Sequence, residues 1–96
     1  MSGEILRRRV TITNPQGFHM RPQMAFVKLA RTFRSTITVC RDDLRVDGKS
    51  PMELLLVAAT FPPSQLVIEA RGTDAAAALD ALAAVVEAPT ESEEES

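Results

Sequence analysis

Gly17-Phe18-His19-Met20-Arg21-Pro22 decides how the first half of the chain is organised, because a strand pattern ends before this stretch and a helix pattern begins within it. Asn14-Pro15-Gln16-Gly17 has the residue types of a turn and ends the strand. Pro22 suits the first turn of a helix, where a missing N–H costs little. We therefore expect His19, the only histidine of the chain, to lie at the start of a helix over Met20 to Phe33.

A histidine at a helix start is well placed to react with an anion. The first backbone N–H groups of the helix, those of Met20 and Arg21, have no intrahelical partner and point toward an incoming anion. Neutral imidazole is a nucleophile, and Arg21 adds donors that suit phosphate oxygens. The group therefore favours an imidazole that accepts a phosphoryl group. By position alone, a histidine at a helix start is more often a helix cap or an ordinary surface residue.

The rest of the chain alternates between strand and helix patterns. Leu6, Val10 and Ile12 share one face of a first strand, which precedes the helix. Further strands are expected at 35–41, 44–47 and 66–70, and further helices from Ser50 and after Gly72-Thr73-Asp74, with a turn at Asp42-Asp43 and a breaker at Pro62-Pro63. We predict that Leu79, Leu82, Val85 and Val86 form the buried stripe of the last helix. This order predicts an α+β fold with helices on one face of an antiparallel sheet and water on the other.

Composition limits the class of protein. Ninety-six residues, 45% of them hydrophobic, form one domain that is too small for a deep cavity. No apolar run is long enough to span a membrane and residues 1–10 do not form a secretory signal, so we expect a cytoplasmic protein. The single cysteine, Cys40, excludes an intramolecular disulfide and a multi-cysteine metal site. We expect no metal and no cofactor.

The charge is distributed unevenly between the body of the chain and its last residues. Residues 87–96 contain five of the thirteen acidic residues and no basic residue. We expect them to form a disordered acidic tail after a domain at 1–86. The remaining residues carry eleven basic and eight acidic side chains, a net charge of +3 that suits an acidic partner surface.

The first helix has more apolar surface than its core requires. Helical periodicity assigns one arc to the core, consisting of Ala25, Phe26, Leu29, Ala30 and Phe33. A separate arc combines apolar and basic residues: Met20, Met24 and Val27 with Arg21, Lys28 and Arg31. Exposed methionines beside basic residues indicate a docking surface, because methionine adapts to varied partners. Scattered apolar surface residues are the ordinary alternative.

Ser50-Pro51-Met52-Glu53 has the pattern of a capping box, with serine at the N-cap, proline at N1 and glutamate at N3. This pattern explains Ser50 fully as the start of a helix. A regulatory role for Ser50 rests on a family resemblance and not on this pattern.

Residues 17–22 resemble the active-site signature of HPr, the histidine-containing phosphocarrier family of the bacterial sugar phosphotransferase system, and the resemblance extends from Leu6 to Val86. It implies an open-faced β-sandwich of four strands and three helices in the order β-α-β-β-α-β-α. It also implies that His19 is phosphorylated on Nδ1, that Arg21 stabilises the phosphate, and that Gly17 and Pro22 support the site.

The same resemblance implies a place in a relay. Enzyme I, charged by phosphoenolpyruvate, would donate to His19, and IIA-type proteins of sugar uptake would receive the group. The chain would then be a monomeric carrier and not an enzyme in its own right. Lys49-Ser50 with Met52 matches the segment that HPr kinase/phosphorylase modifies, which makes Ser50 a regulatory candidate. Further docking contacts are expected from Lys49, Pro51, Met52 and Leu55, with a place in the core as the equal alternative for Leu55.

Two alternatives come from other functional classes. A regulatory HPr-like protein would serve a nitrogen branch of phosphotransfer, or control a kinase or transcription factor through Ser50, without sugar transport. An RNA-binding domain would need aromatic residues on the sheet. The four phenylalanines, Phe18, Phe26, Phe33 and Phe61, fall outside the expected strands, so we expect no nucleic-acid partner.

Met20 and Gln23 are bulkier than the family's small residues at these positions, which can alter access to His19.

Overall fold

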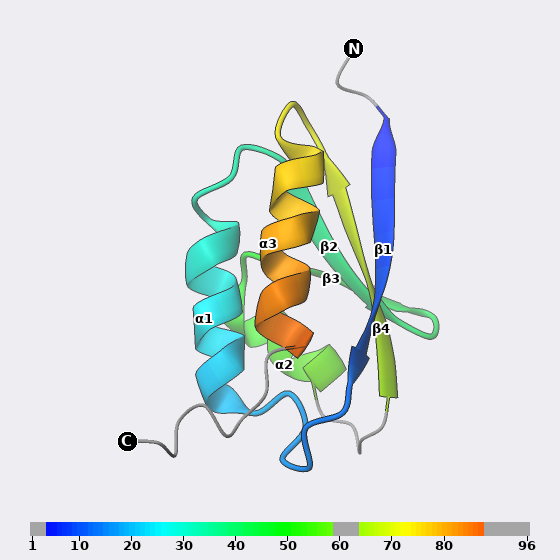
Figure 1. Ribbon diagram of the computed structural model, residues 1–96, viewed down its shortest axis with the longest axis vertical. Helices are drawn as coiled ribbons and strands as arrows, with labels where there is room; N and C mark the ends of the chain where they lie inside the picture. Colours follow the sequence, from blue (N-terminus) through cyan, green and yellow to red (C-terminus); the bar gives the residue numbers. More distant parts are fainter. Residues whose placement is uncertain (1–3, 59–63, 88–96) are drawn as a thin grey trace.

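The computed structural model describes residues 4–58 and 64–87. Its elements follow one another along the chain as β1 (Ile5–Ile12), α1 (Met20–Ala30), β2 (Thr36–Arg41), β3 (Leu44–Asp47), α2 (Pro51–Ala58), β4 (Ser64–Arg71) and α3 (Ala75–Glu87). The strands form one antiparallel sheet in the order β1-β4-β2-β3. Figure 1 shows the three helices on one face of this sheet. The predicted α+β class and element order are therefore confirmed.

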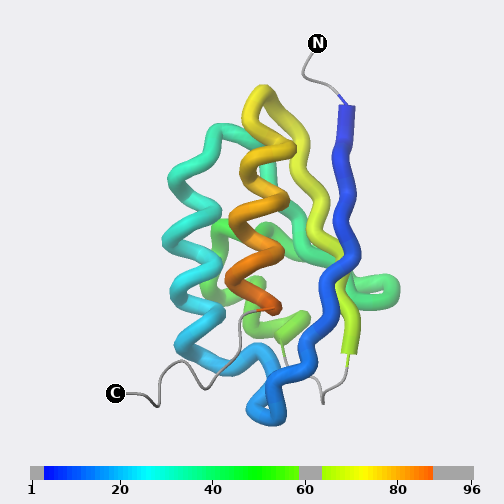
Figure 2. The backbone as a smooth tube through the Cα atoms, viewed as in Figure 1, coloured from blue at the N-terminus to red at the C-terminus, as the bar shows by residue number. Residues whose placement is uncertain are grey.

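The core lies between the sheet and the helices. Alternate residues of the strands point toward the helices and are buried, as the alternating patterns predicted; they include Val10, Ile12, Ile37, Val39, Leu66 and Ile68. Phe26, Leu54 and Leu82 complete the core from α1, α2 and α3. The backbone trace in Figure 2 shows α1 and α3 side by side over the sheet, with β1 at one edge.

Several element ends differ from the expected ones. α1 ends at Ala30 and not at Phe33, because the chain tightens there: the Thr32 and Phe33 amides donate to Leu29 and Ala30, three residues back. β4 is longer than residues 66–70 and spans Ser64–Arg71. α3 continues to Glu87, which had been assigned to the acidic tail. The Pro62-Pro63 breaker and residues 88–96 lie outside the described residues.

The buried side of α1 is rotated from the predicted arc. Ala25, assigned to the core, is exposed, whereas Val27, assigned to the docking surface, is buried. Both α2 and α3 pack against α1, and α2 covers the side on which Val27 lies. The pattern of α1 alone does not reveal this second neighbour, so the predicted arc is wrong at Ala25 and omits Val27. Phe26 and Ala30 are buried, and Leu29 and Phe33 pack against the core, as predicted.

Asp74 joins two connections at the same end of the molecule. It directly precedes α3, where its carbonyl accepts from the Ala78 amide, and its carboxylate accepts bonds from the Arg34 amide at 2.8 Å and the Ser35 amide at 2.9 Å. The hydroxyl of Ser35, which is fully buried, donates to the same carboxylate. These bonds, that of Ser35 first, hold the pKa of Asp74 below its usual range.

Replacing Asp74 with asparagine should reduce the loss of stability in acid. A lowered pKa means that the carboxylate stabilises the fold above its unfolded pKa of about 3.9, and that this contribution is lost as the pH falls through the folded value. Thermal unfolding from about pH 6 to pH 2 should therefore show a shallower acid decline in Asp74→Asn, starting from a lower melting temperature. Asp80→Asn, at an exposed ion pair, is the control. An unchanged acid decline in Asp74→Asn would contradict the assignment.

Candidate functional site

A tight turn delivers the chain from β1 to His19. The Gly17 amide donates to the Asn14 carbonyl at 2.7 Å, and the Gln16 amide donates to Asn14 Oδ1 at 2.9 Å. Gly17 is buried and has a φ of +70°, a backbone conformation that is unfavourable for residues other than glycine. Gly17 therefore allows the tight turn that precedes His19.

His19 is the N-cap residue of α1, as predicted, and its side chain makes no capping bond. Its neighbour Phe18 is buried and meets Phe26 of α1 edge to face, with ring centroids 5.9 Å apart. Phe18 thus anchors the turn in the core and leaves His19 half-buried at the surface. Nδ1 of His19 lies 3.4 Å from the Gly17 carbonyl oxygen, a distance beyond the usual range of a hydrogen bond.

Gln23 fixes the backbone before His19. Its Nε2 donates to the Phe18 carbonyl at 2.7 Å, and its amide donates to the His19 carbonyl at 3.1 Å as the first intrahelical bond. The sequence alone identifies Gln23 only as a bulky residue near His19. The structure makes it a positioning residue for the turn, a role that a small residue cannot fill. The sequence feature that could have revealed this role is an amide side chain in the first turn of the helix.

The start of α1 has the features that an anion requires. Intrahelical bonding begins with the Gln23 amide, so the N–H groups of Met20 and Arg21 precede it. Pro22, in the same turn, has no N–H to leave unsatisfied. Arg21 is exposed and adds a positive charge to this turn. The arrangement can hold an oxyanion beside the imidazole through backbone N–H groups and a guanidinium.

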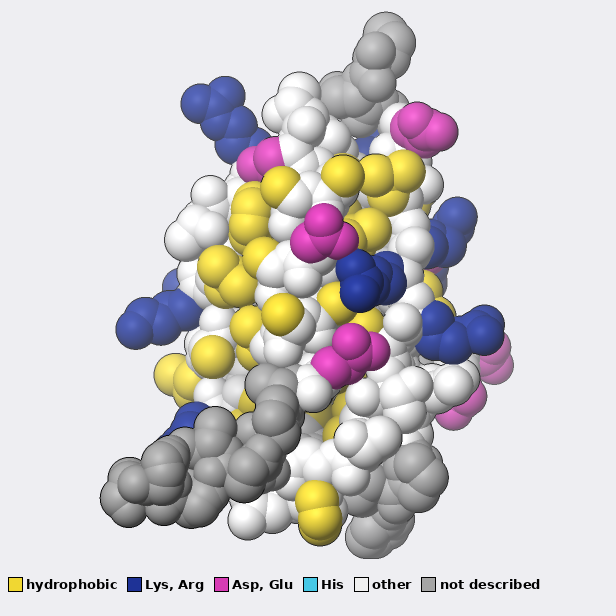
Figure 3. Space-filling view, in the orientation of Figure 1, with side chains coloured by type: hydrophobic (Ala, Val, Ile, Leu, Met, Phe, Trp, Pro, Cys, Tyr) yellow, Lys and Arg dark blue, Asp and Glu magenta, His cyan; other side chains and the backbone are white. Residues whose placement is uncertain are grey.

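An apolar groove lies between α1 and α2, and one of its lining residues, Met20, directly follows His19 in the sequence. It has a volume of about 120 Å³ and is lined by Met20, Gln23, Met24, Val27, Pro51, Met52, Leu54 and Leu55. Met20 and Met52 are 64% and 75% exposed, and Met24 and Leu55 are about half exposed. Hydrophobic side chains over α1 and α3 are also visible from the helical side of the molecule (Figure 3). The two predicted docking segments thus form one continuous surface, with Val27 at its buried floor.

Two of the basic residues assigned to docking also hold the fold together. Arg31 Nε donates to the Lys49 carbonyl at 3.0 Å, and Lys49 Nζ donates to the Phe33 carbonyl at 2.9 Å. These bonds connect the end of α1 to the loop before α2. Lys28 and Arg31 are exposed, whereas Lys49 is half-buried.

Ser50 caps α2, but the capping box is only half formed. The Glu53 amide donates to Ser50 Oγ at 3.2 Å, as predicted. The Glu53 carboxylate does not return to the Ser50 amide; it accepts from the Asp47 amide at 2.9 Å, while the Ser50 amide donates to the Asp47 carbonyl. Glu53 therefore fixes the end of β3. Ser50 is half-buried and lies beside Pro51 of the groove.

Within the described part of the chain, no group of three or more metal-ligating side chains comes together, and no helix is long and apolar enough to cross a membrane.

Comparisons with known proteins extend over most of the chain. The family model described as "PTS HPr component phosphorylation site" matches residues 6–88. The phosphocarrier protein HPr of Neisseria meningitidis serogroup A is 36% identical over 78 residues, which cover 81% of this chain and 86% of that protein. The phosphocarrier protein NPr of Proteus mirabilis is 37% identical over 81 residues, 83% of this chain and 89% of that protein. The crystal structure of the HPr from Bacillus anthracis has a TM-score of 0.81 and 33% identity, and covers 88% of this chain and all of that one.

Proposed function

Because the chain belongs to the HPr family of phosphocarrier proteins, we propose that it accepts a phosphoryl group on Nδ1 of His19 from phosphorylated enzyme I and passes it to IIA-type acceptors of sugar uptake. The observation that supports this most strongly is the position of His19, half-buried at the N-cap of α1, between an anchored Phe18 and the first free amides of the helix. Such a carrier works as a monomer in the cytoplasm.

The proposed transfer needs positioning and charge stabilisation and little else from the carrier. Nδ1 supplies its lone pair to phosphorus while the bond from phosphorus to the donor breaks, and the ring proton stays on Nε2. The amides of Met20 and Arg21, with the Arg21 guanidinium, then receive the oxygens of the phosphoryl group. Gln23 and Phe18 keep the ring at the helix start, which reduces the entropy lost on reaching the reactive arrangement.

The α1–α2 groove would receive both donor and acceptor. Met20 and Met24 extend from the His19 end of α1, and Met52 and Leu55 face them from α2. Their flexible apolar side chains can pack against more than one partner, and the basic residues Arg21 and Lys28 would attract acidic partner surfaces.

Replacing Met52 with glutamate should weaken docking without changing the chemistry at His19. Met52 is 75% exposed, so the fold should lose at most about 0.5 kcal/mol. A carboxylate in an apolar interface costs more than 1 kcal/mol of binding, so the KM of enzyme I for the carrier should rise about fivefold or more while kcat changes little. Leu56→Glu, at an exposed α2 residue outside the groove, is the control. Equal effects of the two substitutions would contradict the docking assignment.

Ser50 is proposed as a regulatory phosphorylation site of HPr kinase/phosphorylase. A phosphate there adds nearly two negative charges at the start of α2, beside Pro51 and Met52 of the groove. The helix dipole would tolerate this charge, but an acidic, phosphorylated partner would be repelled.

Incubation with ATP and an HPr kinase/phosphorylase should therefore add one acid-stable phosphate to the chain and slow its later phosphorylation by enzyme I. Ser50→Ala should take up none, while losing only about 1 kcal/mol of stability from the cap. Phosphate uptake by Ser50→Ala, or an unchanged rate with enzyme I after modification, would remove the regulatory role.

A second candidate is the nitrogen branch, because the chain is as similar to a protein named NPr as it is to HPr proteins. Offering the phosphorylated chain a sugar-specific IIA protein and a nitrogen-branch acceptor side by side separates the two candidates. Faster transfer to the sugar-specific protein supports the primary proposal. Transfer to the nitrogen-branch acceptor alone would replace it.

A further inference from the structure

The sheet face opposite the helices carries a cluster of arginines. Strand alternation places Arg7 and Arg9 of β1, Arg71 of β4 and Arg45 of β3 on this face. The acidic residues among the strand positions of the same face are Glu69 and Asp47, so these six residues carry a net charge of +2. The face is thus basic, and it lies on the other side of the sheet from the helix layer that contains the α1–α2 groove.

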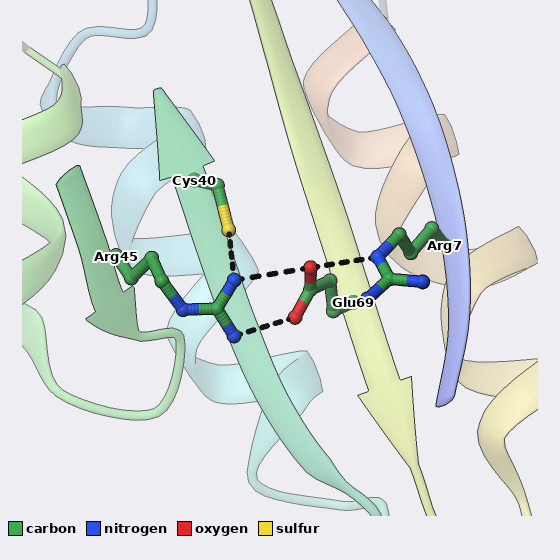
Figure 4. Close-up of polar contacts among 4 residues, drawn as sticks. All are labelled: Arg7, Cys40, Arg45 and Glu69. Carbon is green, nitrogen blue, oxygen red and sulfur yellow. Dashed lines mark hydrogen bonds and ion pairs between the residues drawn. The ribbon is translucent and has the colours of Figure 1, made fainter. Parts of the chain in front are cut away.

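Glu69 holds two of these arginines in fixed orientations. Arg7 Nε donates to Glu69 Oε2 at 2.9 Å from one side, and Arg45 donates from the other, Nη2 to Oε1 at 2.7 Å and Nη1 to Oε2 at 3.2 Å. Figure 4 shows the two guanidinium groups converging on the carboxylate across the strands. Glu69 is buried, whereas the side chains of Arg7 and Arg45 are more than half exposed.

This geometry prepares the arginines for a further acidic group. Glu69 bonds the Nε atom of Arg7, so the two terminal nitrogens of Arg7 are not used in the bonds that the described residues make with it. Glu69 already restrains both side chains by hydrogen bonds, so a ligand would not bear the full entropy cost of immobilising them. The Arg45 hydrogen bond, with help from Arg7, lowers the pKa of Glu69, which keeps this arrangement ionised at neutral pH.

The face is also hollowed beside the cluster. A depression of about 130 Å³ is lined by Ile5, Thr36, Thr38, Arg45, Glu69, Ala70 and Arg71. It brings two arginines and two threonine hydroxyls to one place beside Glu69, whose negative charge is already paired with Arg7 and Arg45. These donors suit a further carboxylate. Arg7 and Arg9 lie on β1, the strand next to β4, and are about 7 Å apart because they are two residues apart on one strand.

We propose that this arginine face binds an acidic segment of a partner protein, with one carboxylate in the depression between Arg45 and Arg71 and others on Arg7 and Arg9. In an extended segment with acidic residues at alternate positions, the carboxylates repeat at the same spacing of about 7 Å. Protein carboxylates fit better than single-stranded nucleic acid, which needs aromatic stacking: in the described residues, the phenylalanines lie outside the strands. A partner bound here leaves the helix layer, and His19, free.

The test uses the full chain and a peptide of alternating glutamate and threonine, titrated while backbone amide shifts are followed by NMR. The expected shifts map to β1, β3 and β4 around the arginines. Arg9→Gln with Arg71→Gln should weaken binding about three- to tenfold, because two exposed ion pairs are lost. Arg7 and Arg45 are not substituted, since that would leave Glu69 buried and unpaired.

Arg8→Gln is the matched control, since Arg8 lies on the same strand but points to the helix side, where it pairs with Asp80 at 2.8 Å. Equal weakening by Arg8→Gln, shifts confined to the α1–α2 groove, or no binding would overturn the proposal. Tighter peptide binding after Glu91, Glu93, Glu94 and Glu95 are changed to glutamine would also overturn it, because the chain's own acidic residues would then be the occupant. Phosphorylation of His19 should be unaffected in Arg9→Gln/Arg71→Gln, so this proposal and the carrier function can fail separately.

Discussion

Replacing His19 with alanine should abolish phosphoryl acceptance from enzyme I and leave the fold intact. The ring is half-buried, caps no backbone group of α1, and lies at the long distance of 3.4 Å from its polar neighbour, the Gly17 carbonyl. Its removal should therefore change the free energy of unfolding by about 0.5 kcal/mol or less. The loss of the nucleophile, in contrast, leaves no atom to accept phosphorus at this site. Phosphate uptake and urea unfolding measure the two effects separately.

Arg21→Ala is the graded companion of this change. The amides of Met20 and Arg21 remain in this variant, so transfer should slow by about ten- to a hundredfold and not stop. Arg21 is exposed, and stability should again change little. An unfolded His19→Ala protein would contradict the surface position of the ring, and an unchanged transfer rate in Arg21→Ala would remove the role of the guanidinium.

Replacing Phe26 with alanine should destabilise the protein by about 3–5 kcal/mol, the range for a fully buried aromatic residue. Phe26 has no exposed surface and contacts the ring of Phe18. It also lies beneath Gly48, where a β-carbon would be only 3.2 Å from Phe26 Cε1. Because Phe18 anchors the turn before His19, the variant should also accept phosphate more slowly at temperatures where it is still folded. Urea unfolding gives the first effect and the transfer rate the second.

Phe33→Ala is the control for Phe26, because Phe33 is only partly buried against the same core. It should cost clearly less than Phe26→Ala and leave the transfer rate unchanged. A loss of less than about 1 kcal/mol in Phe26→Ala would contradict the described core.

The order of the elements was predictable because local patterns determine it. The alternation around Ile37 and Val39, the turn at Asp42-Asp43 and the cap at Ser50 each depend on residues close in sequence. The buried side of α1 was not predictable in the same way. Whether Ala25 or Val27 is buried depends on where α2 and α3 pack against α1. The helical periodicity of α1 carries no information about the position of these two helices.

The site divides in the same way. The placement of His19 at the helix start followed from the glycine, proline and arginine around it. The cluster of Arg7, Glu69 and Arg45 did not, because it depends on the strand order β1-β4-β2-β3, which brings together residues far apart in the chain. Periodicity assigns a side chain to a face of the sheet but does not identify the neighbouring strand.

Phosphorylation of His19 is tested most directly by the intact mass of the full chain after incubation with phosphoenolpyruvate and a bacterial enzyme I, before and after brief acid treatment. A carrier phosphorylated on His19 should gain one phosphate that acid removes and that His19→Ala never acquires. A chain that gains no phosphate, or a phosphate that survives acid and is also found on His19→Ala, would contradict phosphorylation of His19.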